Sequence, residues 1–567
     1  MNYHNPYGPK LDEYLSLRRL GAGVFLSVTE APCEHKLQAA IESLCSSDNV
    51  HCETFETILS MERTPTCAYL YLLLSDVKVF PSCIRLLRAY CQEGRGILDH
   101  AYGFLCLQVM ALSVEIAKLN QAKQLDIVLQ ILTQAAVQFP AFDLLSHYSR
   151  KLEINEFCED EYLRPSPQLL GWHTDPDTRL ETCLTCIGGC NIQDVQFLVD
   201  ELWYARSLLL EASEYAAGTF PGWCGLFYVM HDTLVKVFGN FTRRSETSKE
   251  RTYWIHLLEV MRRYSVYSEA SEDSSLSFLL RDCPQFAETS ETSVTTPVES
   301  ARVVKAYIDK IGRLPTFKYA YVTRLYGFAC ANYHVDAARS NEHLTNICAA
   351  SLEEYWAELL RANRLDVGQW YQLSNTIAAT STMLLTWRNH PVNESLLLSI
   401  LTHVDFFELL GRMILFPMSI DGETFGRNRH LEWEVHSHEV LSMFGRLIRV
   451  RLANESFEPD PTLIFIWEKI FNCFDFHKRL TSKGVKYKQD YASTWQTAWL
   501  HVGAALNLVW PMKSWMRCDY PRCAAPHTRD LFVCARDNGS SYCGMRCYQA
   551  DQTDTDTPRR MICGEFA

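Results

Sequence analysis

No uninterrupted apolar run in this 567-residue sequence approaches the roughly 20 residues with which a helix spans a bilayer. The longest runs, such as Ala68–Leu74, stop far short of that length. The N-terminal residues also lack the apolar stretch of a secretory signal peptide. We therefore expect an intracellular protein, nuclear or cytoplasmic, with no membrane partner.

An excess of basic residues is also missing. The 54 lysines and arginines are outnumbered by 67 aspartates and glutamates, which gives a formal net charge of −13. Binding to nucleic acid requires a concentrated positive face that neutralises phosphates. The charge balance therefore argues against nucleic acid as a partner.

Cysteine, in contrast, is abundant, with 22 residues. In a secreted chain this number would suggest disulfides. In the reducing compartment expected here, buried free thiols and metal ligands are the better interpretation.

Convincing strand patterns are scarce, because few segments alternate apolar and polar residues between turn signals. Helical patterns recur instead. Apolar residues between Val195 and Ala212 follow three- and four-residue steps, with Asn191 as a candidate N-cap and Gly218 as a candidate stop. This pattern predicts one amphipathic helix.

Two further helix starts carry proline at the first helical position. Thr296-Pro297-Val298-Glu299 has the pattern of a capping box and predicts a helix over Ala301–Ile311. Asp460-Pro461 opens a segment whose residues from Leu463 to Phe474 are apolar nearly all round, as in a buried helix.

The predicted fold class is therefore all-α, a multi-helix stack in the form of an irregular solenoid or bundle, with a small cysteine-rich module at the C-terminal end. The length predicts several domains. We divide the chain into an N-terminal α-helical region at 1–264, a Ser/Thr/Glu-rich linker or loop at 265–298, a second α-helical region at 299–512 and the cysteine module at 513–567.

The cysteine module is the segment whose chemistry can be argued residue by residue. Two close pairs of thiols, one C-x4-C and one C-x3-C, are separated by a loop, and each pair could deliver two sulfurs to one Zn²⁺ at about 2.3 Å. So short and polar a segment needs a metal to fold. Its six cysteines are Cys518, Cys523, Cys534, Cys543, Cys547 and Cys563.

At the C-x4-C step and at Tyr542-Cys543-x3-Cys547 this module resembles the MYND-type zinc finger family, in a form similar to its fungal members. The resemblance covers 513–567 only. It implies a cross-brace of two interleaved zinc ions and the recognition of short, proline-containing peptides in partner proteins.

The resemblance also implies which residues bind each ion. The first and third cysteine pairs form site one, which is complete here: Cys518, Cys523, Cys543 and Cys547. Site two takes the second pair with a late histidine and cysteine, but no histidine follows His527 and an aspartate replaces one cysteine. What remains of site two is Cys534, Asp537 and Cys563.

Two interpretations of site two stay open. In one, Asp537 and an acid such as Asp554 or Asp556 complete a mixed sulfur and oxygen site, since carboxylates are legitimate zinc ligands. In the other, site two is empty and Cys534 and Cys563 are free thiols. Replacing sulfur and imidazole with carboxylates lowers zinc affinity, which favours the empty site and one Zn²⁺ per chain.

A site closed by four thiolates has no open position for water and is structural rather than catalytic. The sequence also lacks a Gly-x-Ser-x-Gly motif, a P-loop and a dinucleotide fingerprint. It lacks the Asn-His-type motif of SET methyltransferases, some of which carry MYND fingers. We therefore favour a non-enzymatic protein that binds other proteins or short peptides. The alternative is an enzyme with an unrecognised active site in the helical body.

Overall fold

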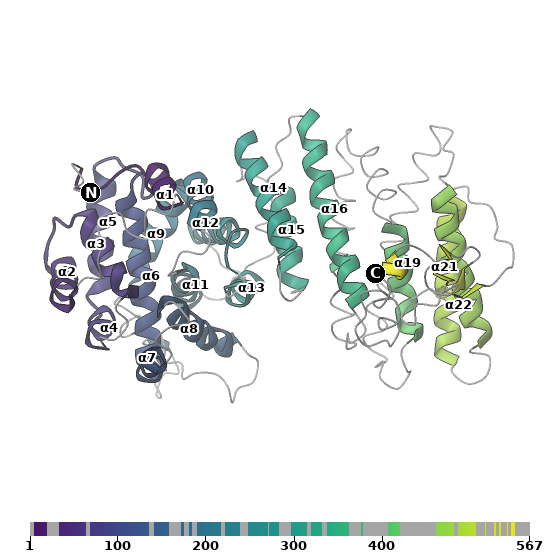
Figure 1. The fold of residues 1–567 in the computed structure, drawn as a ribbon, viewed down its shortest axis with the longest axis horizontal. Helices are drawn as coiled ribbons and strands as arrows, with labels where there is room; N and C mark the ends of the chain where they lie inside the picture. Colours follow the sequence, from purple (N-terminus) through teal and green to yellow (C-terminus); the bar gives the residue numbers. More distant parts are fainter. Residues whose placement is uncertain are drawn as a thin grey trace, which may run out of the picture. The chain divides into compact units, whose positions relative to one another are not determined.

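The computed structural model of the protein describes residues 5–19, 33–63, 68–134, 141–157, 172–174, 181–183, 190–216, 222–238, 248–269, 272–282, 296–313, 319–331, 337–361, 373, 376–377, 406–419, 461–480, 486–505, 516–517, 527–528, 532–533, 541–542 and 546–549. The chain divides into two compact units, Met1–His334 and Val335–Ala567. Helices dominate both units (Figure 1), and the strands form two-stranded ribbons of two or three residues each. The expected all-α, multi-helix fold is confirmed.

In its described residues the first unit is a helical assembly with one short ribbon, in which β1 pairs with β2. Its elements are α1 (Leu11–Arg19), α2 (Glu34–Ser46), α3 (Cys52–Leu59), η1 (Ser60–Arg63), α4 (Ala68–Leu74), α5 (Val79–Gln92), α6 (Ala101–Gln121), α7 (Leu125–Gln134), α8 (Ala141–Phe157), β1 (Trp172–Thr174), β2 (Glu181–Cys183), α9 (Ile192–Tyr204), α10 (Arg206–Ala216), α11 (Cys224–Phe238), α12 (Ser248–Ser265), α13 (Asp273–Asp282), α14 (Pro297–Ile311) and α15 (Tyr319–Ala331).

Helix α6 is the core helix of this unit, and α3, α4, α5, α7, α8 and α11 pack around it. Every residue from Ala101 to Leu119 is buried. A Cβ on Gly103 would overlap the carbonyl oxygen of Ile97, so only glycine permits this close approach. Among the described helices α6 is the one long and apolar enough to cross a membrane, and 94% of that apolar window is buried inside the fold. Packing by its neighbours accounts for its composition.

The segment predicted as one helix after Asn191 is two helices, α9 and α10. The predicted cap is confirmed: the Asn191 side chain accepts hydrogen bonds from the backbone N–H of Gln193 and Asp194, at 2.9 and 3.0 Å. The helix ends at Ala205, where Nη1 of Arg206 donates to the carbonyl of Trp203 at 2.9 Å. That side-chain contact satisfies one of the carbonyls at the helix end. The predicted stop at Gly218 lies outside the described residues.

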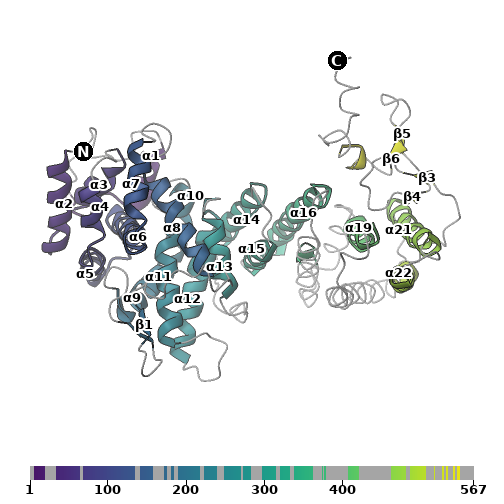
Figure 2. The ribbon, with the colours of Figure 1, turned by 90° about the horizontal axis from the view of Figure 1, so that it is seen from below.

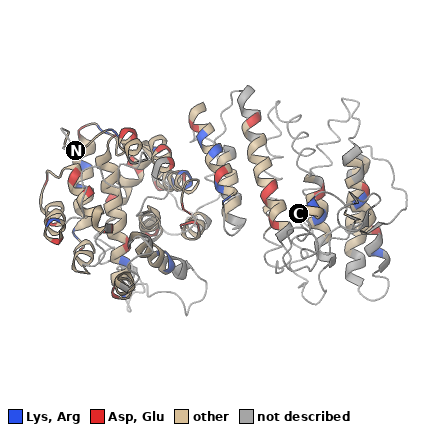
Figure 3. Ribbon diagram, in the orientation of Figure 1, with Lys and Arg blue, Asp and Glu red and all other residues tan. Residues whose placement is uncertain are grey.

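The predicted helix start at Thr296 is confirmed, because its Oγ1 accepts a hydrogen bond from the backbone N–H of Glu299 at 3.2 Å. The Glu299 carboxylate accepts a hydrogen bond from Arg263 of α12. Helix α14 carries basic and acidic residues interspersed along its length (Figure 3). Some of these charges therefore hold helices together rather than facing solvent.

The segment 265–298 is not a linker over its described part. Residues 273–282 form α13, which packs against α8, α11, α12 and α15 and buries Leu276, Leu279 and Leu280 completely. The Asp273 carboxylate accepts a hydrogen bond from Nζ of Lys310 at 2.6 Å. The polar composition was misleading because some of these side chains are buried hydrogen-bond partners. The boundary between the two compact units instead lies between His334 and Val335 in the sequence.

Over its described residues, the second unit contains α16 (Ala337–Arg361), α19 (Phe406–Ser419), α21 (Pro461–Leu480), α22 (Lys486–Ala505) and two further ribbons. Helix α19 packs on α16, α21 and α22, and α21 packs along α22. The predicted start of α21 at Pro461 is confirmed. The indole N–H of Trp467 donates to the carbonyl of Trp499, and that of Trp499 to the carbonyl of Trp467, each at 3.0 Å. This reciprocal pair locks α21 to α22.

Candidate functional site

The C-terminal segment begins with two antiparallel ribbons. Strand β3 (Met516–Arg517) pairs with β4 (His527–Thr528), and β5 (Phe532–Val533) pairs with β6 (Ser541–Tyr542). Strand β4 also packs against α21 (Figure 2). Residues 546–549 then form a single helical turn. The described part of the segment therefore has the order ribbon, ribbon, helical turn.

The cysteines of the segment can be placed along the chain relative to these strands and this helical turn. Cys518 and Cys523 both belong to the connection between β3 and β4. Cys534 comes directly after β5, and Cys543 directly after β6. Cys547 is the second residue of the helical turn. Cys518, Cys534 and Cys543 thus each follow a strand directly, and Cys547 lies within the helical turn.

One of the predicted ligands, Cys547, is described by the structure. The others lie outside the described residues: Cys518, Cys523, Cys534, Asp537, Cys543 and Cys563. No group of three or more His, Cys, Asp or Glu side chains that could hold a metal occurs within the described part of the chain. Zinc binding therefore stays a prediction.

The surroundings of Cys547 are polar although the residue is completely buried. Nη2 of Arg412, on α19, donates a hydrogen bond to its Sγ at 3.2 Å. Arg412 is 2% exposed, and its Nε donates to Oε1 of Glu408 at 2.9 Å. A neighbouring guanidinium favours a negatively charged sulfur, which is the form that binds zinc. The environment of Cys547 fits a metal ligand better than it fits an inert core thiol, which apolar neighbours would surround.

The helical turn is also held by α16. Nη2 of Arg546 donates to Oε1 of Glu353 at 2.9 Å, and its Nη1 lies 3.4 Å from Oε2 of the same carboxylate. The Arg546 guanidinium lies 4.4 Å from the ring centre of Trp356, a buried residue that the Arg412 guanidinium approaches to 5.3 Å. Two arginines thus share one indole, as cation–π contacts allow.

The tyrosine of the Tyr-Cys-x3-Cys step has a structural role. Tyr542 is buried, and its ring packs edge-on against the ring of Tyr548 with 5.5 Å between centroids. This pair joins β6 to the helical turn. Aromatic pairs of this geometry stabilise by about 0.5–1.5 kcal/mol beyond the area that they bury.

No local pattern in the sequence pointed to Arg412, Glu353 or Trp356 as neighbours of the cysteine module. Arg412 is 135 residues from Cys547 and Glu353 is 193 residues from Arg546. No local spacing rule reaches that far. The signal that could have drawn attention to Arg412 was a charge within an apolar helical pattern, four residues after Glu408.

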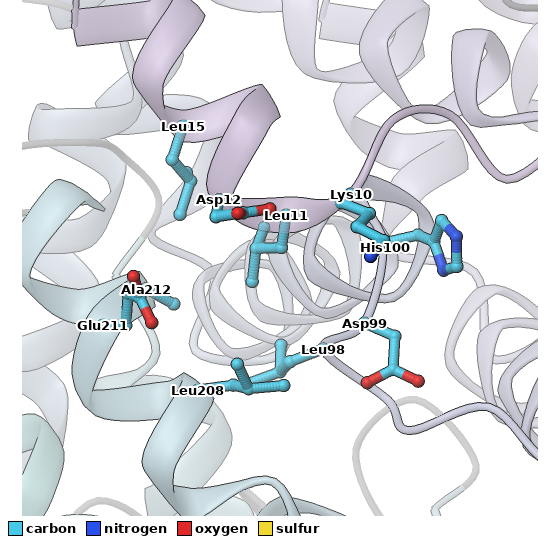
Figure 4. Close-up of a pocket in the computed structure, with 10 residues that line it drawn as sticks. All are labelled: Lys10, Leu11, Asp12, Leu15, Leu98, Asp99, His100, Leu208, Glu211 and Ala212. Carbon is cyan, nitrogen blue, oxygen red and sulfur yellow. The ribbon is translucent and has the colours of Figure 1, made fainter.

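A separate open pocket of about 360 Å³ lies in the first unit, between α1, α10 and the residues before α6 (Figure 4). Leu11, Leu98 and Leu208 converge on it, whereas the His100 ring points away from them (Figure 4). Burial lowers the pKa of His100, and its Nδ1 lies 2.9 Å from the Tyr90 hydroxyl. The His100 ring is thus engaged outside the pocket, and these residues do not form a nucleophile and base pair.

No protein-family model, curated protein or solved structure matches this chain. The cysteine spacing and the contacts around Cys547 are therefore the features that indicate a function.

Proposed function

We propose that this protein is a non-catalytic, zinc-binding interaction protein whose helical body carries a MYND-like finger at 513–567. One Zn²⁺ is held by the four thiolates of site one: Cys518, Cys523, Cys543 and Cys547. The observation that carries this proposal is the buried Cys547 thiol, which accepts a hydrogen bond from the Arg412 guanidinium at 3.2 Å.

The ribbons support the division of the cysteines into two sets. Val533 pairs with Ser541 and Phe532 with Tyr542, so the last residues of the two strands, Val533 and Tyr542, lie at opposite ends of the ribbon. The next residues in the chain are Cys534 and Cys543. The cross-brace that the family resemblance implies assigns these two cysteines to different ions, which suits strand ends on opposite sides of the ribbon.

The metal is structural in this proposal. Four thiolates fill the tetrahedral shell of zinc and leave no position for a reacting water. The finger and the helical surface then act by recognising other proteins, and the finger takes short, proline-containing peptides, as its family resemblance implies. The same resemblance and the absence of nucleic-acid signals in the charge balance make a protein the proposed partner.

Metal analysis of the purified full-length chain tests the proposal. We expect about one zinc per chain, and loss of that zinc in Cys543→Ser. Cys33→Ser is the matched control, because Cys33 is an exposed thiol in the first unit. Two zinc ions per chain would mean that site two is filled as well, and a zinc content near zero would remove the finger from the proposal.

Peptide binding tests the second half of the proposal. Immobilised proline-containing peptides should retain the zinc-loaded chain and not the Cys543→Ser variant. Equal retention of both proteins would assign recognition to the helical body instead, and retention of neither would contradict a peptide-binding finger.

A further inference from the structure

Arg412 connects the helical body to the cysteine segment. Its Nε contacts the Glu408 carboxylate one turn earlier on α19, and its Nη2 contacts both that carboxylate and Sγ of Cys547. Glu408 also accepts a hydrogen bond from Lys469 of α21. The thiol is therefore attached to a buried ionic group that ties α19 to α21.

A second contact attaches the same helical turn to α16. Arg546, the residue before Cys547, forms a two-pronged ion pair with Glu353 and lies over the ring of Trp356. The ion pair is partly exposed and contributes little alone. With the buried Arg412 contact, however, it fixes the turn on two helices. The cysteine module at 513–567 is thus not an independent domain, because its helical turn packs on α16 and α19.

We propose that Arg412 is a positioning residue for Cys547 as a zinc ligand, so that zinc binding is linked to the folding of α16 and α19. The inference rests on the proposed zinc site. It adds that the helical body supplies part of the site's surroundings, and that loss of the metal loosens helices more than 100 residues away in sequence.

The physical reason lies in the charge and geometry of the contact. A thiolate bound to zinc keeps negative charge, and an N–H donor directed at the sulfur stabilises that charge and orients the side chain. Removal of such an outer hydrogen-bond donor typically weakens metal binding by about 10- to 100-fold. By linkage, the free energy of zinc binding then also stabilises the helices that hold the donor.

The first test is a zinc competition titration of full-length variants against a chromophoric chelator. Arg412→Met, which keeps the length of the side chain and removes its charge and donors, should bind zinc about 10- to 100-fold more weakly than the wild type. Arg263→Met is the matched control, because Arg263 is an equally buried arginine with a glutamate partner four residues earlier in the first unit. It should leave zinc affinity unchanged. Wild-type affinity in Arg412→Met would overturn the proposal.

Arg412→Lys separates the role of the charge from the role of packing. Lysine keeps a positive charge and a donor near Cys547 but loses the planar contact with the Trp356 ring. We expect a smaller loss of zinc affinity than in Arg412→Met. Equal losses in both variants would assign the effect to packing and overturn the positioning role.

The second test uses the wild-type chain, so it does not depend on a variant that folds. Amide hydrogen exchange is followed with and without a zinc chelator. Zinc removal should speed exchange in α16 and α19 as well as in 513–567, and should leave α5 and α6 of the first unit unchanged. Faster exchange confined to 513–567 would overturn the linkage while leaving the zinc site itself in place. A wild-type chain that binds no zinc would instead contradict the proposed function.

Discussion

Each of the two units contains a buried arginine paired with a glutamate, but the two arginines differ in their other partners. Arg263 of α12 and Arg412 of α19 are both buried, and the Nε of each donates to a glutamate one helical turn earlier, at 2.8 and 2.9 Å. In the first unit Nη1 of Arg263 donates to Glu299 of the neighbouring helix α14. In the second unit Nη2 of Arg412 donates to Sγ of Cys547, which is 135 residues away. One guanidinium joins two helices, and the other joins a helix to a thiol.

A buried guanidinium needs negatively charged partners, so the groups around it indicate which charges the fold supplies. Arg263 has two carboxylate partners in the first unit, Glu259 and Glu299, so its charge is balanced within the helical body. A sulfur partner is negative only as a thiolate, which a metal stabilises. The proposed zinc site therefore predicts that zinc removal destabilises the second unit and leaves the first unit unchanged.

Removal of the Arg263 guanidinium, whose partners are carboxylates, should produce the largest loss of stability. Arg263→Met leaves the buried Glu259 and Glu299 without their cation and should lower the free energy of unfolding of the first unit by about 3–5 kcal/mol. Urea denaturation measures this change. The control is Arg302→Met, which removes the partly exposed Arg302–Glu211 pair and should cost about 0–1 kcal/mol. Similar losses in both variants would contradict a special role for burial.

The second unit is tested at a close contact between α21 and α22. A Cβ on Gly503 of α22 would overlap the ring of Trp467, so Gly503→Ala should destabilise this unit by about 1–3 kcal/mol through overpacking. Gly312→Ala is the matched control, because its Cβ would meet no atom closer than 3.7 Å. Thermal unfolding of both variants gives the difference, and an unchanged melting temperature for Gly503→Ala would show that α21 and α22 can separate freely.

The next prediction concerns the N-terminal cap of α14, the helix that supplies Glu299. Thr296→Ala removes the side chain that caps the backbone N–H of Glu299 and should cost about 0.5–2 kcal/mol in the first unit. Thr296→Ser keeps the hydroxyl and should retain most of the stability. Denaturant midpoints compare the two variants, and a serine variant as unstable as the alanine variant would exclude the capping contact as the cause.

The smallest expected effect is a pH dependence of the first unit. Burial lowers the pKa of His256, against the opposing influence of Asp200, whose carboxylate lies 3.1 Å from its ring. The unfolded chain therefore takes up a proton near pH 6.5 that the folded chain takes up only at lower pH. The stability from neutral His256 is complete above about pH 6.5 and decreases as the pH falls through that value.

Denaturant midpoints between pH 7.5 and 5.5 measure this dependence, and His256→Gln should flatten the curve. A midpoint that rises as the pH falls, in a manner abolished by His256→Gln, would mean that Asp200 outweighs burial and raises the histidine pKa instead.

Local signals in the sequence predicted several features correctly. The caps at Asn191 and Thr296 and the helix start at Pro461 depend on contacts within a few residues, so they can be read from spacing. The break at Ala205 and the packing of α13 could not, because the first depends on an arginine side chain and the second on partners in several other helices. The cysteine module was visible from its spacing, and its attachment to the helical body was not.

The sequence by itself determined the helical class, the helix starts and the candidate zinc ligands, because periodicity, capping and thiol spacing act over distances of a few residues. Only the tertiary structure decided that 273–282 belongs to a core and that Cys547 lies beside Arg412. Those contacts join residues far apart in the chain, and they form where burial makes an unbalanced charge or an unpaired donor too unfavourable to leave alone.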